Sequence, residues 1–379
     1  MPSSCLGDVA KFINGAAFKP EDWGDAGLPI IRIQNLTGSN KQFNYTTRTV
    51  KPDLHVKRGD MLVSWSATLD VFVWDGPEGL LNQHIFKVIP NSNVDRRFLF
   101  HTLKSKIAEL NGKTHGSTMK HVVRGDFEGT VINLPPLDEQ QRIADILDRA
   151  ASIQRLRQAA DEKLKQIIPA LFVDMFGDPA SNPKGWPMTT VGDLIESADY
   201  GSSAKAHDEA TGLPMLRMGN VTIGGALDLK NLKYVELEPA EQAKCTLRKG
   251  DILFNRTNSK ELVGKTGIWD GSCDAVFASY FIRLRTKPDV MTAEVLWAFM
   301  NSKHTKGLLF GMARGAIGQS NINSKELRAI RLFAPPIALQ ERFSQLYYDL
   351  KAKAEMSTAA TTAAKSIAAS LANDIFSAA

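Results

Sequence analysis

The sequence predicts an α+β protein built from two copies of a mixed domain, each followed by a long helix. Three observations support this prediction: segments of the first half return in the second, short apolar runs alternate with Gly-, Asn- and Ser-rich stretches, and two long segments repeat apolar or small residues at heptad spacing. Strands and helices mix without a regular βαβ alternation, which favours the α+β class. We expect the mixed domains at residues 1–137 and 178–337, and the helices at 138–177 and 338–379.

The internal repeat is visible in pairs of segments that keep the same order in both halves. The separation between partners grows from 185 to 191 and then to 200 residues along the chain. Such steps are expected when surface loops lengthen between fixed elements. The pairs are LGDVA (from Leu6) with VGDLI (Val191), LPIIRIQNLT (Leu28) with LPMLRMGNVT (Leu213), KRGDMLV (Lys57) with RKGDILF (Arg248), and NLPPLDEQQRI (Asn133) with FAPPIALQERF (Phe333).

The two helical segments have equal length and matching ends. Between a proline pair and a final DMF (Asp174) or DIF (Asp374), neither carries an insertion relative to the other. Helices that pair in register do not tolerate insertions, so we expect an antiparallel coiled coil and a pseudo-twofold arrangement within the chain. The alternative is two unrelated amphipathic helices, each packed on its own domain. The expected seam consists of Ile143, Ile146, Ile153, Leu164, Ile167 and Leu171 in the first helix, and Phe343, Leu346, Leu350, Ile367 and Leu371 in the second.

Composition indicates a globular protein of the cytoplasm. The chain has 379 residues, of which 43% are hydrophobic and 23% charged, as in ordinary globular domains. No apolar run approaches the roughly 20 residues needed to cross a bilayer, and no secretory signal is evident. The three cysteines, Cys5, Cys245 and Cys273, lie far apart and predict neither a disulfide framework nor a zinc site.

Local charge is more informative than the net charge of +5. A basic cluster between residues 101 and 124 has a counterpart between residues 303 and 331. Either cluster alone is also typical of a solvated surface. Their recurrence at matching positions favours binding of a polyanion.

The motifs resemble a known family. LPPLDEQQRIADILD (Leu134 to Asp148) closely resembles the start of the spacer helix in specificity subunits of Type I restriction-modification systems, the HsdS family, and ALFVDMFGDP (Ala170 to Pro179) resembles its end. GDILFNRTNSKELVGKTGIW (Gly250 to Trp269) is similar to a segment of their target-recognition domains. The resemblance covers essentially the whole chain, with one departure, Leu339, where the family often has an acid before Gln.

The resemblance implies a division of labour. Each target-recognition domain would read one half of a split double-stranded DNA target, and the helices would fix the spacing between the halves. Modification subunits, which carry an adenine methyltransferase and its S-adenosylmethionine, would dock on the helices. A motor-nuclease subunit would join for restriction.

Sequence readout needs polar and basic side chains on loops, which predicts where DNA binds. FNRTNSK (Phe254 to Lys260) is the densest such stretch, and its counterpart VSWSATLD (Val63 to Asp70) has no basic residue. The two domains are therefore expected to read different sequences. The candidates are Ser64, Ser66, Thr68, Asn82, Gln83, His84, Lys113, His115, Ser117, Lys120 and His121 in the first domain, and Asn255, Arg256, Thr257, Asn258, Ser259, Lys260, Ser279, Tyr280, Arg314, Gln319 and Ser320 in the second.

A repeated Arg-x-x-Asn motif has two possible roles. Arg32 with Asn35 recurs as Arg217 with Asn220. Because a reader of different sequences would not repeat, we expect the motif either to grip phosphate or to fix backbone geometry, with Asn ending a strand in a turn.

Catalytic motifs are not recognised in the sequence. DNA amino-methyltransferases use an Asn- or Asp-Pro-Pro-aromatic motif, but here Leu134 separates Asn133 from the prolines and Leu137 replaces the aromatic residue. No metal-ligand cluster is evident. We expect a non-catalytic recognition subunit without cofactor or metal. The alternatives are a coiled-coil scaffold without sequence-specific binding and a fused DNA methyltransferase.

Overall fold

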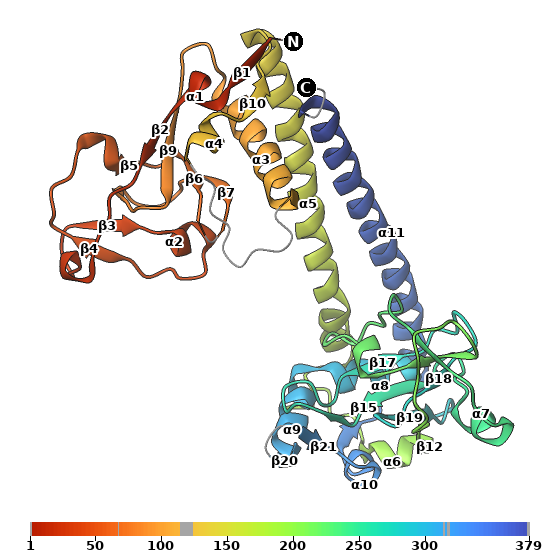
Figure 1. Ribbon diagram of the computed structural model, residues 1–379. Helices are drawn as coiled ribbons and strands as arrows, with labels where there is room; N and C mark the ends of the chain where they lie inside the picture. The colour runs from red at the N-terminus through yellow and green to blue at the C-terminus, as the bar shows by residue number, and fades with distance from the viewer. Residues whose placement is uncertain (1, 67, 114–123, 314, 317–318, 377–379) are drawn as a thin grey trace. The chain divides into compact units, whose positions relative to one another are not determined.

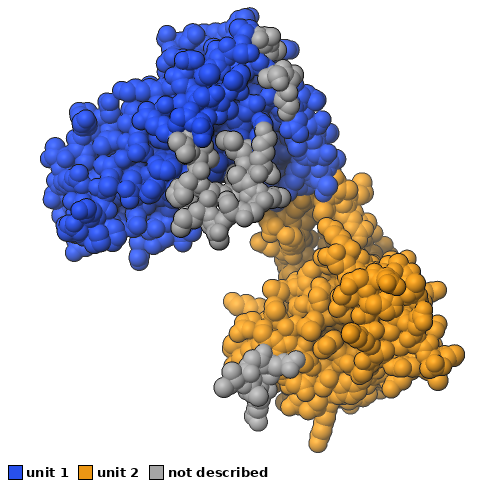
Figure 2. Space-filling model, in the orientation of Figure 1, with its two compact units in different colours: residues 1–158, 360–379 blue, residues 159–359 orange. Residues whose placement is uncertain are grey.

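The computed structural model describes residues 2–66, 68–113, 124–313, 315–316 and 319–376. It divides into two compact units (Figure 2). Unit 1 comprises residues 1–158 and 360–379, and unit 2 comprises residues 159–359. The two long helices, α5 (Leu137–Phe176) and α11 (Ile337–Phe376), each contribute one part to each unit.

Unit 1 contains two four-stranded sheets and a short ladder, visible in Figure 1. The first sheet is antiparallel and has the order β2-β9-β6-β7. The second has the order β4-β3-β8-β5, with β3 and β8 parallel. The strands of unit 1 are β1 (Ser3–Cys5), β2 (Ala10–Asn14), β3 (Leu28–Ile31), β4 (Asn44–Thr46), β5 (His55–Val56), β6 (Met61–Ser64), β7 (Asp70–Val73), β8 (Gly79–Leu81), β9 (Ile85–Pro90) and β10 (Val131–Asn133). The shorter helices of unit 1 are α1 (Leu6–Val9), η1 (Pro20–Asp22), α2 (Ile33–Thr37), η2 (Pro52–Leu54), α3 (Arg96–Lys113) and α4 (Arg124–Glu128).

The first sheet of unit 1 is apolar on both faces because successive side chains of a strand point to opposite sides. Val63 on β6 and Phe86 on β9 pack against Leu99 and other residues of α3. The neighbouring residues Leu62 and Ile85 face the other way, into a core shared with the second sheet. The first sheet is therefore the central layer of the domain.

Unit 2 repeats this plan. Its main sheet has the order β12-β19-β15-β17, and its second sheet has the order β14-β13-β18, again with one parallel pair, β13 and β18. Its elements are β11 (Met188–Thr190), α6 (Val191–Leu194), β12 (Ile195–Tyr200), β13 (Leu213–Leu216), η3 (Met218–Asn220), β14 (Lys233–Val235), α7 (Pro239–Cys245), β15 (Ile252–Asn255), β16 (Thr257–Asn258), β17 (Thr266–Ile268), β18 (Val276–Phe277), β19 (Phe281–Thr286), α8 (Ala293–Asn301), α9 (Lys303–Met312), β20 (Gly315–Ala316), β21 (Gln319–Asn321), α10 (Ser324–Arg328) and β22 (Arg331–Phe333). The expected fold class, two repeated mixed domains with two long helices, is confirmed.

The helices run antiparallel in each unit. In unit 1, Ile143 near the start of α5 packs with Leu371 and Phe376 near the end of α11. In unit 2 the ends are exchanged: Phe172 and Phe176 of α5 contact Phe343 near the start of α11, at ring-centroid distances of 6.0 and 5.4 Å. The contact between α5 and α11 at each end therefore belongs to the core of one unit.

The residues expected in the seam divide into covered and exposed positions. Ile143, Leu164, Leu171, Phe343, Leu346, Leu350 and Leu371 are buried or half-buried. Ile146, Ile153, Ile167 and Ile367 are exposed instead, Ile367 to 68%. The covered stripe passes through polar residues in mid-helix, where Ser357 Oγ donates to Asp161 Oδ1 at 2.6 Å. The covered stripe is therefore not a continuous apolar heptad pattern, whereas the exposed isoleucines beside it do follow heptad spacing.

The repeated Gly-Asp motif is structural in both units. Asp60 Oδ2 accepts from the backbone N–H of Lys57 at 2.8 Å, and Asp251 Oδ2 accepts from that of Arg248 at 2.9 Å. Each carboxylate also pairs with a cation on the adjacent strand, Asp60 with Lys87 and Asp251 with Arg285, both at 2.8 Å. The motif thus closes the turn that starts β6 or β15.

One buried glutamine fastens each domain to its long helix. Gln140 Oε1 accepts from the N–H of Asp95 at 2.7 Å, and its Nε2 donates to the carbonyl of Pro135 at 2.8 Å. Gln340 does the same in unit 2: Oε1 accepts from Thr292 N at 2.9 Å, and Nε2 donates to the carbonyls of Pro335 and Val290 at 2.7 and 3.0 Å. Both side chains therefore hold the proline pair and the loop before α3 or α8 at the first turn of the helix.

We predict that Gln340→Leu destabilises unit 2. It leaves one buried and two partly buried backbone groups without their glutamine partner, at a cost of about 2 to 4 kcal/mol in the free energy of unfolding. Equilibrium urea denaturation measures this cost. The matched control is Gln345→Leu on the same helix, where the exposed amide donates to Asp349, and its effect should stay within about 0.5 kcal/mol. Equal denaturation midpoints for Gln340→Leu and wild type would contradict the prediction.

Candidate nucleic-acid interface

Two of the predicted DNA-contacting segments of unit 1, the β6–β7 loop and Asn82–His84, lie together at one end of the central sheet. The β6–β7 loop starts after Ser64, which is paired with Ile85 of β9, and the backbone N–H of Trp65 donates to the carbonyl of His84 at 3.1 Å. The indole of Trp65 contacts the His84 ring at 4.8 Å and stacks on Phe86 at 5.7 Å. This aromatic packing fixes the segment Asn82–His84, whose side chains are half-buried or exposed.

The corresponding loops of unit 2 also meet. The N–H of Arg256 donates to the carbonyl of Tyr280 at 2.9 Å, and β16 pairs with β21, which places Thr257 opposite Asn321. Thr257 Oγ1 donates to Asn321 Oδ1 at 3.2 Å. The stretch that follows β15, the Ser279–Tyr280 turn and the β20–β21 hairpin therefore form one surface.

Two cations of this surface rest on aromatic rings. The guanidinium of Arg256 lies 4.9 Å from the centre of the Tyr200 ring, and its Nη1 donates to the carbonyl of Ser279 at 3.4 Å. The ammonium of Lys260 lies 4.4 Å from the ring centre of the exposed Phe310. A stacked guanidinium is held in place before a ligand arrives, which lowers the entropy cost of binding.

The repeated Arg-x-x-Asn motif fixes backbone geometry through its asparagine. Asn35 Oδ1 accepts from the N–H of Arg32 at 2.9 Å, and Asn220 Oδ1 accepts from that of Arg217 at the same distance. The asparagine amide groups donate to later carbonyls of the same turn, including that of Asp228 at 2.9 Å. The arginine side chains are half-buried, and Arg32 stacks on Trp23 at 5.0 Å.

Residues 2–166 and 183–356 match the family model described as the Type I restriction modification DNA specificity domain. The chain belongs to this family. It is therefore a DNA specificity subunit of a Type I restriction-modification system, as the resemblance of its motifs implied. Within the part of the chain that the structure describes, no helix is long and apolar enough to cross a membrane, and no group of three or more metal-ligating side chains occurs.

Two curated relatives from Escherichia coli match most of this specificity subunit. The EcoBI specificity subunit is 22% identical over 367 residues, which cover 89% of this chain and 76% of its own. The EcoKI specificity subunit is 23% identical over 380 residues, with 89% and 80% covered.

Solved structures support the fold. A chain from a study titled "Structural basis underlying complex assembly and conformational transition of the type I R-M system" aligns with a TM-score of 0.61 and 17% identity, over 99% of this chain and 97% of that one. The S subunit from M. genitalium aligns with a TM-score of 0.55 and 13% identity, over 99% and 96%.

Three of the residues expected to contact DNA are buried in this specificity subunit. Ser64 and Asn255 are fully buried and Ser320 almost so. The Ser64 hydroxyl donates to the carbonyl of Thr68 inside the loop. The expectation for these three is not met in this conformation because each lies in a strand, where alternate side chains point inward.

The remaining candidates divide into accessible residues and residues outside the description. Ser66, Thr68, Asn82, Gln83, His84, Arg256, Thr257, Asn258, Ser259, Lys260, Ser279 and Tyr280 are half-buried or exposed. His115, Ser117, Lys120, His121 and Arg314, and the side chains of Lys113 and Gln319, lie outside the described residues.

Two half-buried lysines, Lys265 and Lys306, lie beside the Arg256 loop, and Lys265 was not among the sequence-predicted candidates. Lys265 Nζ donates to the carbonyl of Met218 at 2.5 Å, and Lys306 Nζ donates to that of Gly264 at 2.6 Å. Among the described residues, neither ammonium has a carboxylate within ion-pair distance. Burial lowers the pKa of Lys306 to about 8, with a further contribution from the charge of Lys265, and burial also lowers the pKa of Lys265. The positive charges of Lys265 and Lys306 make the neighbouring surface, which carries the Arg256 loop, attractive to phosphate groups.

We predict that Lys306 makes unit 2 more stable at alkaline pH. The folded pKa of about 8 lies below the unfolded value of 10.5. Between these values the unfolded chain binds more protons than the folded one, so the free energy of unfolding rises with pH in this window. Urea denaturation of wild type and Lys306→Met should diverge by about 3 kcal/mol in favour of wild type from pH 7 to pH 11.

The control for this measurement is Lys303→Met, at an exposed position of the same helix. Its stability difference from wild type should stay flat over the same pH range. A Lys306→Met difference that is equally flat would contradict the lowered pKa.

Proposed function

We propose that this specificity subunit recognises an asymmetric two-part DNA target and directs a separate adenine methyltransferase to it. The observation behind the proposal is that two units of one fold present different loops. In unit 2 the loop after β15 offers Arg256 and Lys260, whereas the loop after β6 in unit 1 offers Ser66 and Thr68. Because guanidinium, ammonium and hydroxyl groups bond different base edges, the two half-sites differ.

We further propose that the chain itself does not transfer methyl groups. Its proline pairs are the features nearest to a methyltransferase motif, and the carbonyls of Pro135 and Pro335 accept hydrogen bonds from Gln140 and Gln340 inside the domains. These segments therefore serve the attachment of the helix. S-adenosylmethionine accordingly belongs to the modification subunit, and the complex acts on DNA in the cytoplasm, with a motor-nuclease subunit joining for restriction.

The exposed stripe of the long helices supports docking of modification subunits. Leu156 and Met356 occupy matching positions 200 residues apart and are 71% and 73% exposed. Ile167 and Ile367 form a second matching exposed pair. Large apolar side chains at repeated exposed positions are typical of an interaction surface. One such surface on each helix fits two copies of the same partner.

The test separates this function from a scaffold and from a fused methyltransferase. We expect the purified chain alone to leave DNA unmethylated when given labelled S-adenosylmethionine. With modification subunits added, adenines should be methylated at one asymmetric two-part sequence, mapped by sequencing. Label transferred by the chain alone would establish the fused enzyme, and uniform affinity for all sequences would establish the scaffold.

We predict that Arg256→Ala weakens recognition of one half-site only. Loss of a base contact costs about 1–3 kcal/mol and relaxes specificity at the base concerned. Competition binding of the assembled complex to targets mutated in either half-site measures this cost. The control is Arg248→Ala, an exposed arginine of the same unit, which should bind like wild type. An equal loss on all sequences would assign Arg256 to a phosphate instead.

A further inference from the structure

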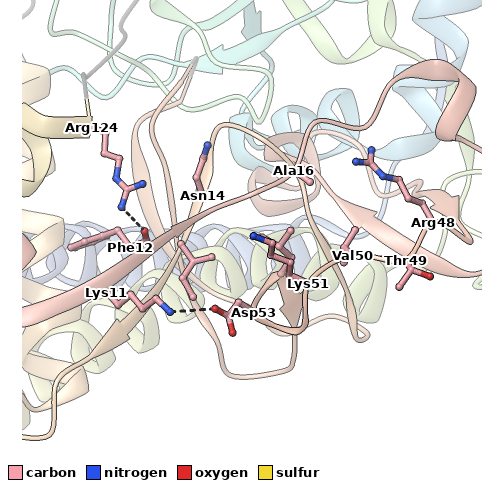
Figure 3. Close-up of a pocket in the computed structure, with 12 residues that line it drawn as sticks. Lys11, Phe12, Asn14, Ala16, Arg48, Thr49, Val50, Lys51, Asp53 and Arg124 are labelled. Carbon is pink, nitrogen blue, oxygen red and sulfur yellow. Dashed lines mark hydrogen bonds and ion pairs between the residues drawn. The ribbon is translucent and has the colours of Figure 1, made fainter.

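Unit 1 contains an open groove that the sequence did not indicate. It has a volume of about 660 Å³ and runs along β2, the edge strand of the central sheet. Residues 11–14 of β2 form one wall, residues 48–54 form the other, and Arg124 closes one end. Figure 3 shows the side chain of Lys51 between the two walls.

The groove is lined by four cations and one carboxylate. Lys11 pairs with Asp53 at 3.2 Å, and Arg48 pairs with Asp22 at 3.1 Å. Arg124 pairs with Glu128 at 2.9 Å and also donates to the carbonyl of Phe12, as Figure 3 shows. Exposed pairs of this kind contribute little to stability and can exchange partners with a ligand.

Lys51 differs from the other three cations of the groove because its ammonium group has no carboxylate partner among the described residues. Its exposed ammonium makes no hydrogen bond or ion pair with any described residue, whereas Lys11, Arg48 and Arg124 each have a carboxylate. Because a Lys ammonium carries three donors, it is free to bind an anion that enters the groove.

The groove adjoins the candidate DNA-contacting loops. Asn14 lies in its wall, and Asn14 Oδ1 accepts from the indole Nε1 of Trp65 at 3.4 Å. Trp65 in turn packs on His84 in the Asn82–His84 loop. A DNA strand that contacts these loops therefore lies beside the open side of the groove, because only one or two side chains separate the loops from it.

Among the described residues, the positions of unit 2 that the repeat matches to this groove carry acidic side chains. Pro29 faces Tyr45 across β3 and β4, and Pro214 faces Tyr234 across β13 and β14, so the two tyrosines are equivalent. The segment after Tyr45 leads to Arg48 and Lys51. The segment after Tyr234 instead holds the exposed Glu236 and Glu238, and the exposed Glu196 stands where the repeat places Lys11.

We propose that the groove of unit 1 holds the sugar–phosphate backbone of the bound DNA, with Lys51 contacting one phosphate. We expect the contact at one half-site only, because Glu196, Glu236 and Glu238 occupy the compared positions of unit 2. Its site is distinct from the base-reading loops, and it adds affinity without adding sequence preference. Double-stranded DNA is the occupant rather than an acidic peptide because the groove continues the loop surface. The inference rests on the proposed function.

The test pairs the charge variant Lys51→Gln with single neutral phosphates in the DNA. The assembled complex of this subunit with modification subunits is titrated with its target duplex, in which one phosphate at a time is a methylphosphonate. For wild type, neutralising one or two phosphates at a single half-site should lower affinity. Lys51→Gln should bind unmodified DNA roughly 3- to 10-fold more weakly at low salt, and it should no longer respond to those phosphates.

Two further readouts sharpen the test. The slope of log affinity against log salt should lose about 0.9 in Lys51→Gln, as for one phosphate contact, while the ratio of specific to non-specific affinity stays unchanged. Lys51→Arg should restore binding. The control is Lys41→Gln, which removes an exposed ammonium of the same unit outside the groove and should bind like wild type.

Failure of this inference and failure of the proposed function give different results. The inference is overturned if Lys51→Gln binds the target with the affinity of wild type. It is also overturned if the affinity lost through Lys51→Gln adds to the affinity lost through every methylphosphonate, because the groove then holds none of these phosphates. A loss restricted to particular base sequences would also overturn it. If the wild-type complex shows no sequence preference at all, the proposed function itself fails.

Discussion

Each folded unit depends on the packing of one end of α5 against the opposite end of α11. In unit 1 the ring of Phe376 lies 5.9 Å from that of Phe98, in a core that also holds Ile143 and Leu147. In unit 2 Phe172 lies 6.0 Å from Phe343 within the largest core of the chain. The apolar area buried at these ends is the main contribution that stabilises the helix pair, since its middle is polar. Neither domain is complete without both helices.

The two units share the elements that set their geometry and differ in the charge of their surfaces. Elements that set geometry repeat in detail: the strand order of the main sheet, the asparagine turns, the Gly-Asp turns and the clamp formed by Gln140 or Gln340. The loops and the edge of β2 differ in charge. A common frame with unlike surfaces allows each half-site, and the affinity for it, to change without a change in the fold.

Much of the fold could be predicted from the sequence because each pattern that indicates an element occurs in both halves of the chain. The two helices, the two mixed domains and the loops beyond β6 and β15 all follow from segments that match across the halves. The seam of the helices could not be predicted fully, because Asp161 and Ser357 place polar groups on the contact stripe while Ile153 and Ile167 face away from it. Ser64 and Asn255 have the side chains of DNA readers but stand on the inward face of a strand. The groove was missed because Lys11, Lys51 and Arg124 come from three separate segments, which only the folded sheet brings together.

The division of α11 between the units has a consequence for synthesis. Unit 2 is continuous in sequence, from residue 159 to residue 359, whereas unit 1 needs residues 360–379 to complete its core. On the ribosome the first domain made is therefore the last to be finished, because its final helix segment emerges after all of unit 2. A chain that ends soon after residue 359 loses the packing of its N-terminal domain, whereas unit 2 keeps all of its own residues.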